Sequence, residues 1–522
     1  MRQSPYRPMS RQTLLQELQS VEHFDLTVVG GGATGLGVAL HAALRGHRVA
    51  LLEGHDFASG TSSRSTKLLH GGVRYLAQGN MGLVREALRE RSVVMAMAPH
   101  LAQPLAFVMP SYNAWSTPLY ALGLKLYDVL AGTAGLGPTR WLNRHATLAA
   151  LPGLRAAGLR NGVQYWDGQF EDARLALALA QTAARAGALL LNHTRVTAVT
   201  PPDAQGLHTV HACDAISGRT LALRSRAVVN ATGVWVDQLR TQSAPDAQRL
   251  VSPSQGVHVV VDQRFMPTRQ ALLVPRTRDG RVLFAVPWLG ALVLGTTDTP
   301  RTDLPQDPEP FAHEVDFILQ EAAQVLQQPI TRQDVKSVWV GLRPLVAQQA
   351  GQETKALSRE HTLVREANGM ISITGGKWTT FRVMAEDTLA ACVAAGALPA
   401  RAAPQSLRAP LVGALPGAAA VSLAQPPGPH LYGTAQADVA RLAGADQPLG
   451  MGLTEAMVRF AAREEWAITV EDVLARRWRA LFLDAREARR MAAAVARILQ
   501  AETGHDPQCA AFEALCERYT LA

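Results

Sequence analysis

The chain has 522 residues, of which 48% are hydrophobic and 18% are charged. At about 150 residues per domain this length corresponds to roughly two to four domains, and the composition excludes disorder, collagen and coiled coil as descriptions of the whole chain. The formal net charge is +8, from 51 lysine and arginine residues against 43 acidic ones. Such a surplus suits nucleic acid, an anionic membrane surface or an anionic substrate, and its clustering must decide among them.

Two features indicate the environment of the protein. The chain has four cysteines without CxxC or metal-ligand spacing, which implies no disulfide framework and a reducing compartment. Residues 1–24 contain several arginines but lack the apolar run of a secretory signal. No segment reaches the roughly 18 to 20 uninterrupted apolar residues of a spanning helix. We therefore expect a protein that is soluble or attached to one face of a membrane.

The first regular elements form a β-α-β unit. Residues 24–29 are apolar and β-branched and end at a glycine cluster, which predicts a buried strand. Residues 33–45 alternate small and apolar side chains, which predicts a helix that ends at Gly46, and residues 48–52 predict a second strand. The whole unit has about the thirty residues that this arrangement needs.

A dinucleotide-binding pattern lies at the first turn of this unit. Gly30, Gly32 and Gly35 form G-x-G-x-x-G, in which the glycines permit a tight turn, close approach of a pyrophosphate and close helix packing. The phosphates then lie at the positive end of the helix. Glu53, at the end of the second strand, is placed to accept hydrogen bonds from an adenosine ribose, and its charge disfavours NADP. The alternative is a plain glycine turn.

Further along the chain, short strands alternate with helices. Closely spaced strands between residues 251 and 300 predict an antiparallel platform, which in such proteins usually forms the substrate side of the site. Residues 399–429 contain seven prolines and no helical or strand period, which predicts a linker. The other predicted elements are a helix over 172–186, strands over 196–199, 227–229, 258–261, 282–286 and 291–294, and helices over 470–479 and 485–500.

A polar stretch, TSSRSTKLLHGGVRYL, begins at Thr61. Taken alone it predicts a solvated surface loop. It follows the second strand, however, where a flavin ring and its substrate would lie. Together with the glycine pattern it resembles the FAD-dependent glycerol-3-phosphate dehydrogenases. Further stretches match that family in the same order: YWDGQFEDARL from Tyr165, NATGVW from Asn230, GTTDTP from Gly295, GLRPL from Gly341, then SREHTL, GGKWTTF and EDVLARR from Glu471.

The resemblance implies an α/β fold in which a glutathione-reductase-like FAD-binding domain is built from separated segments. A mixed or antiparallel-sheet substrate domain is inserted between these segments, and an all-helical domain follows. The implied boundaries are an arm over residues 1–24, the two intertwined domains over 25–395, a Pro/Ala-rich linker over 396–430 and the helical domain over 431–522. Leu14, Leu15 and Leu18 in the arm form a helical stripe that suits either lipid contact or docking on the protein.

The resemblance implies FAD as the cofactor. Lys377 would place positive charge near the flavin N1–C2=O region, where the reduced ring is anionic, and a solvated lysine is the alternative. For NATG, the alternative is an ordinary strand-end turn. The implied FAD-binding residues are Gly30, Gly32, Gly35, Glu53, Thr61, Ser62, Ser63, Lys67, His70, Gly71, Gly72, Val196, Ala231, Thr232, Gly233, Gly376, Lys377, Thr379 and Thr380.

The implied substrate is sn-glycerol 3-phosphate. Guanidinium groups suit its phosphate, and surface ion pairs are the alternative for each arginine. His258 is implied as the general base, and a packed strand histidine is the alternative. The implied substrate-binding residues are Arg74, Tyr75, His258, Thr297, Arg343 and Arg359, and the implied catalytic residues are His258, Arg343 and Lys377. No metal is expected. Two departures from the family pattern are Gln255, which is expected to affect substrate affinity, and Trp378, which is expected to pack.

The predicted reaction is the oxidation of sn-glycerol 3-phosphate to dihydroxyacetone phosphate, with electrons passing through FAD to a quinone. The lipid-soluble quinone implies peripheral attachment to the cytoplasmic face of the inner membrane, and the cytoplasm otherwise. The first alternative is an oxidase that reduces O₂ to H₂O₂, and the second is a non-catalytic flavin-binding sensor. Nucleic acid is not an expected partner, because no basic run is interleaved with aromatic residues. A homodimer stays open.

Overall fold

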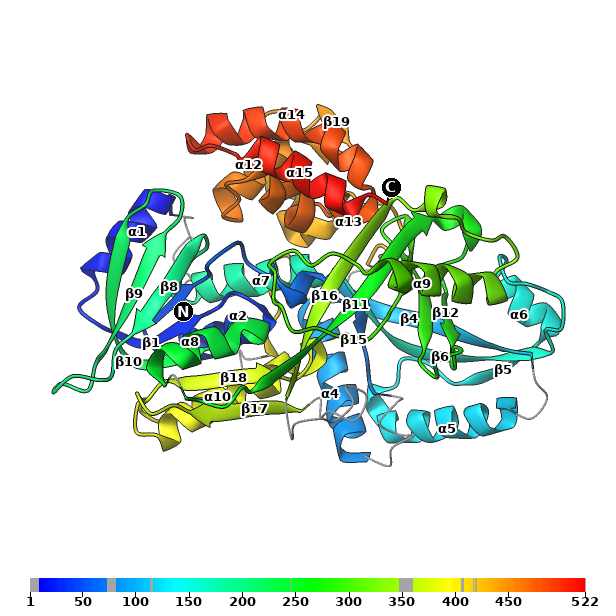
Figure 1. Cartoon of the computed structure of the whole chain (residues 1–522), viewed down its shortest axis with the longest axis horizontal. Helices are drawn as coiled ribbons and strands as arrows, with labels where there is room; N and C mark the ends of the chain where they lie inside the picture. The colour runs from blue at the N-terminus through cyan, green and yellow to red at the C-terminus, as the bar shows by residue number, and fades with distance from the viewer. Residues whose placement is uncertain are drawn as a thin grey trace.

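Two large sheets and a C-terminal group of helices make up the computed structural model of the chain (Figure 1). Segments of the two sheets alternate along the sequence, so neither sheet comes from one continuous stretch. The structure describes residues 9–72, 81–112, 116–244, 246–346, 360–404, 408–415, 417 and 420–521. Arg74, Tyr75 and Arg359 lie outside these residues, so their assigned roles stay predictions.

The first sheet carries the glycine turn. Its main path runs β17-β18-β10-β1-β2-β7, and the hairpin of β8 and β9 extends from β10. The central strands run parallel, so the segments that follow β1, β2, β10 and β18 emerge at one edge. The strands are β1 (Phe24–Val29), β2 (Val49–Leu52), β7 (Leu189–Leu191), β8 (Thr194–Val199), β9 (His208–Asp214), β10 (Thr220–Asn230), β17 (His361–Arg365) and β18 (Ile371–Gly375).

Helix α2 (Ala33–Leu44) follows the glycine turn and is buried along most of its length. It packs between α7 (Asp172–Arg185) and α10 (Phe381–Ala394). Its small side chains make this packing feasible, because a Cβ atom at Gly37 would lie 2.8 Å from Phe381 Cδ2. The alternation of small and apolar residues therefore reflects a helix enclosed by protein.

The second sheet is mixed. Its path runs β15-β11-β14-β13-β12-β4-β6-β3, with β16 paired antiparallel along β11 and β5 paired to β6. Only β12 and β4 pair in parallel among the named pairs of this sheet in the described residues. The strands are β3 (Leu68–Leu69), β4 (Ala102–Ser111), β5 (Arg140–Asn143), β6 (Asn161–Phe170), β11 (Val251–Asp262), β12 (Ala271–Val274), β13 (Leu283–Trp288), β14 (Ala291–Gly295), β15 (Thr299–Pro300) and β16 (Ser337–Val346).

The C-terminal helices lie above the two sheets in Figure 1, and they contact the end where the antiparallel strands β11 and β16 finish and begin, respectively. Their apolar side chains belong to the same buried cluster as α2 and α7, so they share a core with the first sheet. The helices are α12 (Glu455–Glu464), α13 (Ala480–Leu483), α14 (Ala485–Thr503) and α15 (Cys509–Tyr519). The predicted domain boundaries at residues 24, 395 and 430 are not tested and stay predictions.

The helix predicted over residues 470–479 is wrong in form. The structure has a π-helical turn, η10 (Asp472–Arg477), and then Arg479 in the left-handed region with φ of 69°. In an α-helix, consecutive side chains point about 100° apart. The wider turn lets the consecutive Arg476 and Arg477 both reach the buried Asp56, which follows β2. This shared contact explains why the segment is not a regular α-helix.

Two further segments are packed more closely than their sequences suggest. Helix α1 (Arg11–Ser20) buries Leu14, Leu15 and Leu18 against the first sheet, so docking is correct and lipid contact by this stripe is wrong. The described part of residues 399–429 has no α-helix or strand before η9 (Pro429–Ala435), but Leu411 and Leu423 are buried and hydrogen-bond to the body of the protein. Within the described ranges, no helix has both the length and the apolar character to cross a bilayer.

A buried group of charges joins the C-terminal helices to the first sheet. His193 Nε2, just after β7, lies 3.0 Å from Asp472 Oδ2. Asp56, His193 and Asp472 lie close enough together to resemble a metal-binding group. The guanidinium groups of Arg476 and Arg477 face these carboxylates, however, so ion pairs account for the group.

This group makes the stability of the protein depend on pH. Burial alone would lower the pKa of His193, but the Asp472 carboxylate outweighs burial and raises that pKa above its ordinary value of 6.5. The stabilisation is therefore complete below pH 6.5 and disappears as the pH rises through the raised pKa. We expect His193→Gln to melt a few degrees lower than the wild type at about pH 6 and to converge with it by about pH 9. Thermal melts across this range check it, and a gap that widens with pH contradicts it.

Candidate active site

The glycine turn between β1 and α2 is tight. Gly30 has φ of 107°, and a Cβ atom there would lie 2.6 Å from the carbonyl oxygen of Ala231. A Cβ atom at Gly35 would lie 1.9 Å from the carbonyl oxygen of Gly30. Gly32 caps the start of α2. The three glycines therefore bring the end of β10 and the first turn of α2 against one loop, with the positive helix end beside it.

Glu53 is held next to this turn. One carboxylate oxygen accepts a hydrogen bond from Gly31 N–H at 2.6 Å, and the other accepts one from His55 N–H at 2.8 Å. Burial raises the pKa of Glu53, while these two backbone donors oppose the rise. The side chain is half-buried, so it keeps accessible surface at the carboxyl edge of the sheet.

The same edge collects segments that are far apart in the sequence. Ala231, Thr232 and Gly233 follow β10, and Gly376 and Lys377 follow β18. Because β1, β2, β10 and β18 are parallel, these residues join the glycine turn and Glu53 at one edge. Val196 lies half-buried on β8, which begins close to the end of β2. Thr379 and Thr380 are buried where η7 (Trp378–Thr380) leads into α10.

The turn at Thr61–Ser63 joins the two sheets. The Thr61 hydroxyl donates to the carbonyl of Leu342 on β16 at 2.6 Å, and Ser62 Oγ accepts from Ala33 N–H of α2 at 2.9 Å. Trp378 Nε1 donates to the Ser62 carbonyl at 2.8 Å, and its ring packs edge-on against Phe170. The start of this stretch, at Thr61–Ser63, is therefore a bridge between the sheets and not a solvated loop.

Lys67 is misassigned as a cofactor contact. Its side chain is 0% exposed, and Nζ donates to Asp172 Oδ2 and to the Ser63 carbonyl, each at 2.8 Å. The ammonium also lies over the rings of Trp288 and Trp339. Burial lowers the pKa of Lys67 to about 7. Because no part of the side chain is exposed, it cannot contact a cofactor. It stabilises the turn at Thr61–Ser63 through its hydrogen bond to the Ser63 carbonyl.

The second sheet presents Arg343 and His258 on one face. Strands β11 and β16 pair Ser254 with Arg343, Gly256 with Gly341 and His258 with Trp339, and alternate residues share a face. The Arg343 guanidinium lies across Gly256, where a Cβ atom would stand 2.1 Å from its Nη2. A side chain at position 256 would therefore exclude Arg343 from this place.

The orientation of Arg343 is fixed by several acceptors. Nη1 donates to the Gln255 carbonyl at 3.2 Å and to Asp298 Oδ1 at 3.1 Å. Nη2 donates to Thr296 Oγ1 at 3.1 Å and to the Thr297 carbonyl at 2.9 Å. The side chain is 23% exposed, so part of it is accessible from the face of the sheet. A cation held in this way is pre-organised for an anionic group.

His258 is almost fully enclosed. Its ring stacks on Trp339 with centroids 4.1 Å apart, and Nε2 lies 3.0 Å from Thr66 Oγ1. Burial, together with the charges of Lys67 and Arg343, lowers the pKa of His258 well below 6.5, so the ring is neutral. The residue is only 2% exposed, whereas Thr66 is half-buried. Direct substrate contact by His258 is therefore not what the structure shows.

Two other assignments in this region need correction. Thr297 is 2% exposed, and its hydroxyl accepts from Val257 N–H at 3.0 Å and donates to Glu314 at 2.8 Å. This hydroxyl is part of a buried network, and only the Thr297 carbonyl faces Arg343. The Gln255 side chain is fully buried between Glu314 and Arg301, so its amide has no surface open to a substrate, and the expected effect on affinity stays a prediction.

The segment after β3, His70 to Gly72, is partly exposed to solvent. The His70 side chain is 40% exposed, and its Nδ1 lies 3.6 Å from Asp167 Oδ2. Burial would raise the pKa of Asp167, but hydrogen bonding to His70 and the charge of Arg91 lower it overall. Gly71 and Gly72 are buried, and Gly71 N–H donates to Asp167. His70 thus faces the open side while the two glycines serve packing.

Four functional candidates were missed by the sequence. Thr66 bonds to His258, Asp298 to Arg343, and Asp172 to the turn that carries Lys67. These three residues lie inside the stretches that resemble the family. The resemblance therefore covered them, but it did not indicate which residues of each stretch act in the site. Arg479 donates to the Ser63 carbonyl from the C-terminal helices, and its sequence gives no local signal.

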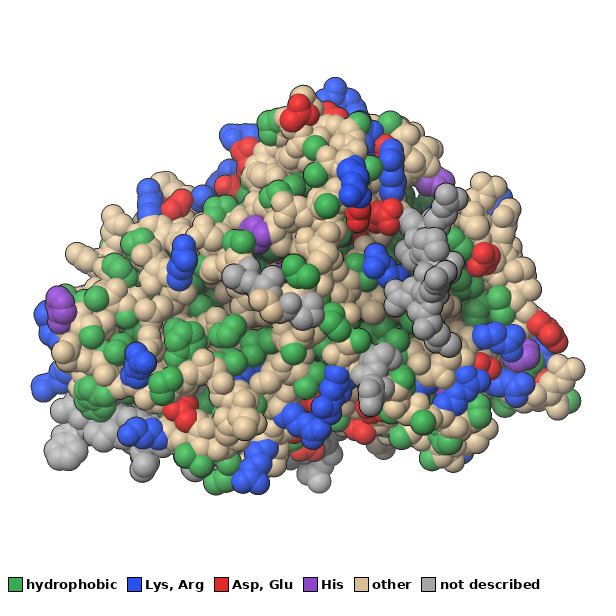
Figure 2. All heavy atoms as spheres, turned by 180° about the vertical axis from the view of Figure 1, so that it is seen from behind, with side chains coloured by type: hydrophobic (Ala, Val, Ile, Leu, Met, Phe, Trp, Pro, Cys, Tyr) green, Lys and Arg blue, Asp and Glu red, His purple; other side chains and the backbone are tan. Residues whose placement is uncertain are grey.

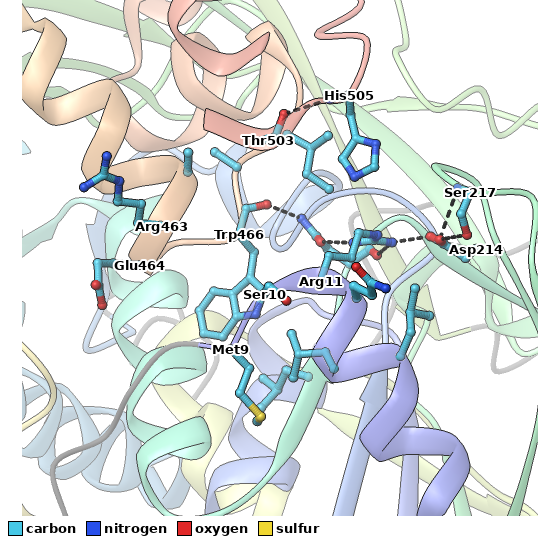
Figure 3. A pocket seen from close by; sticks show the side chains of 18 of the residues that line it. Met9, Ser10, Arg11, Asp214, Ser217, Arg463, Glu464, Trp466, Thr503 and His505 are labelled. Carbon is cyan, nitrogen blue, oxygen red and sulfur yellow. Dashed lines mark hydrogen bonds and ion pairs between the residues drawn. The ribbon is translucent and has the colours of Figure 1, made fainter. Parts of the chain in front are cut away.

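A cavity of about 730 Å³ lies elsewhere, between α1, the loop after β9 and the C-terminal helices. Figure 3 shows the Arg11 side chain directed toward Asp214, with Trp466 and His505 also among the residues that line this cavity. Its lining includes none of the residues assigned to cofactor or substrate. Figure 2 shows lysine and arginine side chains spread over one face with acidic side chains among them.

Comparisons with known proteins agree with this geometry. Residues 25–382 match the family model described as FAD dependent oxidoreductase, and residues 418–510 match the C-terminal domain of alpha-glycerophosphate oxidase. The second match begins inside the segment predicted as a linker.

The chain is similar in sequence to named dehydrogenases and in structure to a solved one. A probable mitochondrial glycerol-3-phosphate dehydrogenase of Caenorhabditis elegans is 39% identical over 96% of this chain and 74% of the relative. The human mitochondrial glycerol-3-phosphate dehydrogenase is 43% identical over 74% of this chain, and the match spans about half (55%) of that relative's length. A solved glycerol-3-phosphate dehydrogenase of Bacillus halodurans, complexed with FAD, has a TM-score of 0.77 at 28% identity over 98% of both chains.

Proposed function

Since the chain belongs to the FAD-dependent oxidoreductases, and among them to the glycerol-3-phosphate dehydrogenases, we propose that it oxidises sn-glycerol 3-phosphate to dihydroxyacetone phosphate. One observation carries the assignment of the site. The Thr61–Ser63 turn joins the dinucleotide edge of the first sheet to the face of the second sheet that holds Arg343 and His258.

The residues at the carboxyl edge fit FAD. The turn at Gly30 and Gly35 has no room for a Cβ atom, and Glu53 is fixed beside it by two backbone donors. Gly32 and the start of α2 would hold the pyrophosphate, and Glu53 the adenosine ribose. Lys377, half-buried after β18, would supply a positive charge at the same edge. When bound, FAD accepts a hydride and passes the electrons on to a second acceptor.

Arg343 is the proposed phosphate ligand. Its guanidinium is oriented by Asp298 and by backbone carbonyls, so little conformational freedom is lost when an anion binds. Arg74, Tyr75 and Arg359 complete the proposed substrate set, and their placement lies outside the described residues. Thr297 contributes its carbonyl to the orientation of Arg343, in place of a hydroxyl contact to substrate.

The C2 hydroxyl proton must leave as the alcohol is oxidised. Thr66 is half-buried and its hydroxyl bonds to Nε2 of His258, which is buried and neutral. We assign Thr66 as the group that contacts the substrate hydroxyl and His258 as the proton acceptor behind it. This arrangement connects the enclosed histidine to the substrate side through one hydroxyl group.

The proposed electron acceptor is a quinone. The lipid solubility of quinones and the basic surplus of the chain support peripheral attachment to the cytoplasmic face of the inner membrane. The alternative acceptor is O₂, which is favoured by one observation, the match of residues 418–510 to the C-terminal domain of an alpha-glycerophosphate oxidase.

One assay separates these acceptors. The holoprotein is mixed with sn-glycerol 3-phosphate and liposomes that contain a long-chain quinone, and quinone reduction and H₂O₂ are both followed. We expect quinone reduction to exceed H₂O₂ formation by at least about tenfold, and glycerol to give no reduction because it lacks the phosphate that Arg343 binds. Dominant H₂O₂ formation would instead support the oxidase, and the absence of co-sedimentation with the liposomes would contradict membrane attachment.

A further inference from the structure

The C-terminal helices place one arginine directly beneath the turn of the candidate site. Arg479 follows the π-helical turn η10, and its side chain is 0% exposed. Nη2 donates to the Ser63 carbonyl at 2.6 Å, and Nη1 donates to the Ala475 carbonyl at 2.8 Å. One guanidinium group thus bonds both to its own helical unit and to the bridge between the two sheets.

The same guanidinium aligns the acidic pair that begins α7. Its Nε lies 3.0 Å from Glu171 Oε1, and its Nη2 lies 3.4 Å from Asp172 Oδ1. The other oxygen of Asp172 accepts from Ser65 N–H at 3.2 Å, from the Ser65 hydroxyl at 2.7 Å and from Lys67 Nζ at 2.8 Å. Because the Arg479 guanidinium faces both of these buried carboxyl groups, removing it takes away a positive charge that compensates them below the turn.

A series of aromatic rings makes a second connection from Arg479 to the candidate site, at His258. The Arg479 guanidinium lies 4.0 Å from the centroid of the Phe482 ring, which lies 5.3 Å from the Trp339 ring. Trp339 in turn stacks on His258. Both connections end at one hydrogen bond, the one between Thr66 and His258, because Thr66 lies between Ser65 and Lys67 in the turn.

We propose that Arg479 is a positioning residue for the oxidation. It fixes the turn from Ser63 to Lys67 so that Thr66 and His258 stand in hydrogen-bonded register beside the substrate. The C-terminal helical unit is therefore part of the catalytic apparatus as well as of the core. This inference rests on the proposed function, and it assigns to that unit a role that its sequence does not reveal.

The test compares Arg479→Met and Arg479→Lys with the wild type as FAD-containing holoproteins. Flavin reduction is followed anaerobically over a range of sn-glycerol 3-phosphate concentrations, which separates the limiting rate from substrate affinity. We expect the limiting rate of Arg479→Met to fall at least about tenfold with the substrate dissociation constant changed less than about threefold. Arg479→Lys keeps the charge opposite Glu171 and Asp172, so its limiting rate should lie between that of the wild type and that of Arg479→Met.

Val495→Ala is the matched control for stability. Val495 is buried on α14 in the same helical unit, and the substitution weakens the core without touching the turn. We expect it to lower the melting temperature and to leave the limiting rate unchanged. An equal loss of rate in Val495→Ala would show that stability, and not positioning, is responsible, and would overturn the inference.

Ser65→Ala covers the case in which Arg479→Met is not recovered with FAD. This milder change removes the hydroxyl that donates to Asp172 and cuts the same connection. We expect its limiting rate to fall about threefold or more, and an unchanged rate would overturn the inference. If wild-type flavin is not reduced by sn-glycerol 3-phosphate at all, the proposed function fails. If the wild type is reduced and Arg479→Met is equally fast, only the role of Arg479 fails.

Discussion

Replacing Arg343 by methionine should lower kcat/KM for sn-glycerol 3-phosphate by at least about 100-fold while FAD content stays at the wild-type level. Losing one charged partner of a hydrogen-bonded pair costs about 2–5 kcal/mol, and each 1.4 kcal/mol is about a factor of ten. The effect should be confined to the substrate, because Arg343 lies on β16 of the second sheet and not on the dinucleotide edge. Steady-state kinetics and the flavin-to-protein absorbance ratio give the two quantities.

Arg365→Met is the matched control for this change. Arg365 is an exposed arginine at the end of β17, an outer strand of the first sheet, so the same atoms are removed at a distance from Gly256 and Asp298. We expect its kcat/KM to stay within about threefold of the wild type. An Arg343→Met enzyme as active as the Arg365→Met control would remove Arg343 from the substrate site.

Gly35→Ala should yield protein with less than about one tenth of the wild-type FAD content. The added Cβ atom would lie 1.9 Å from the Gly30 carbonyl oxygen, and neither group is a flexible side chain that can move aside. Overpacking of this kind commonly costs about 1–3 kcal/mol or more, and here it pushes the first turn of α2 away from the loop that would hold the pyrophosphate. Bound flavin is measured by its visible absorbance after purification.

Gly123→Ala provides the same chemical change without a clash. Gly123 lies inside helix α5 (Ser116–Ala131), and no atom comes within 4 Å of a Cβ atom placed there. Glycine to alanine in a helix interior is stabilising by about 0.5–1 kcal/mol, so FAD content should be unchanged or slightly higher. If Gly35→Ala retained stoichiometric FAD, the glycine turn would not be the cofactor cradle.

The first dinucleotide-binding unit could be predicted from sequence because its determinants are local. Hydrophobic runs, glycine spacing and the position of Glu53 all lie within thirty residues, and the structure has β1, α2 and β2 within one residue of their predicted bounds. The meeting of Ala231–Gly233 and Lys377 with this unit needed the family resemblance. Nothing in their own neighbourhood sets the parallel order of β10 and β18 beside β1.

The errors arise where a side chain's environment depends on distant partners. A lysine in a polar loop predicts exposure, but Lys67 is buried because Asp172, 105 residues later, neutralises it. Thr297 lies in the expected stretch, yet its hydroxyl turns toward Glu314 while its carbonyl meets Arg343. Arg479 and Ser63 are 416 residues apart, so their contact follows only from how the C-terminal helices dock.

We propose that the candidate site transfers a hydride from sn-glycerol 3-phosphate to bound FAD. The most direct measurement is anaerobic mixing of the purified holoprotein with this substrate while the visible absorbance of oxidised flavin is followed. We predict bleaching that saturates with sn-glycerol 3-phosphate and does not occur with glycerol, because Arg343 must bind a phosphate. A bound flavin that stays oxidised with sn-glycerol 3-phosphate, or one that glycerol reduces equally well, would contradict the claim.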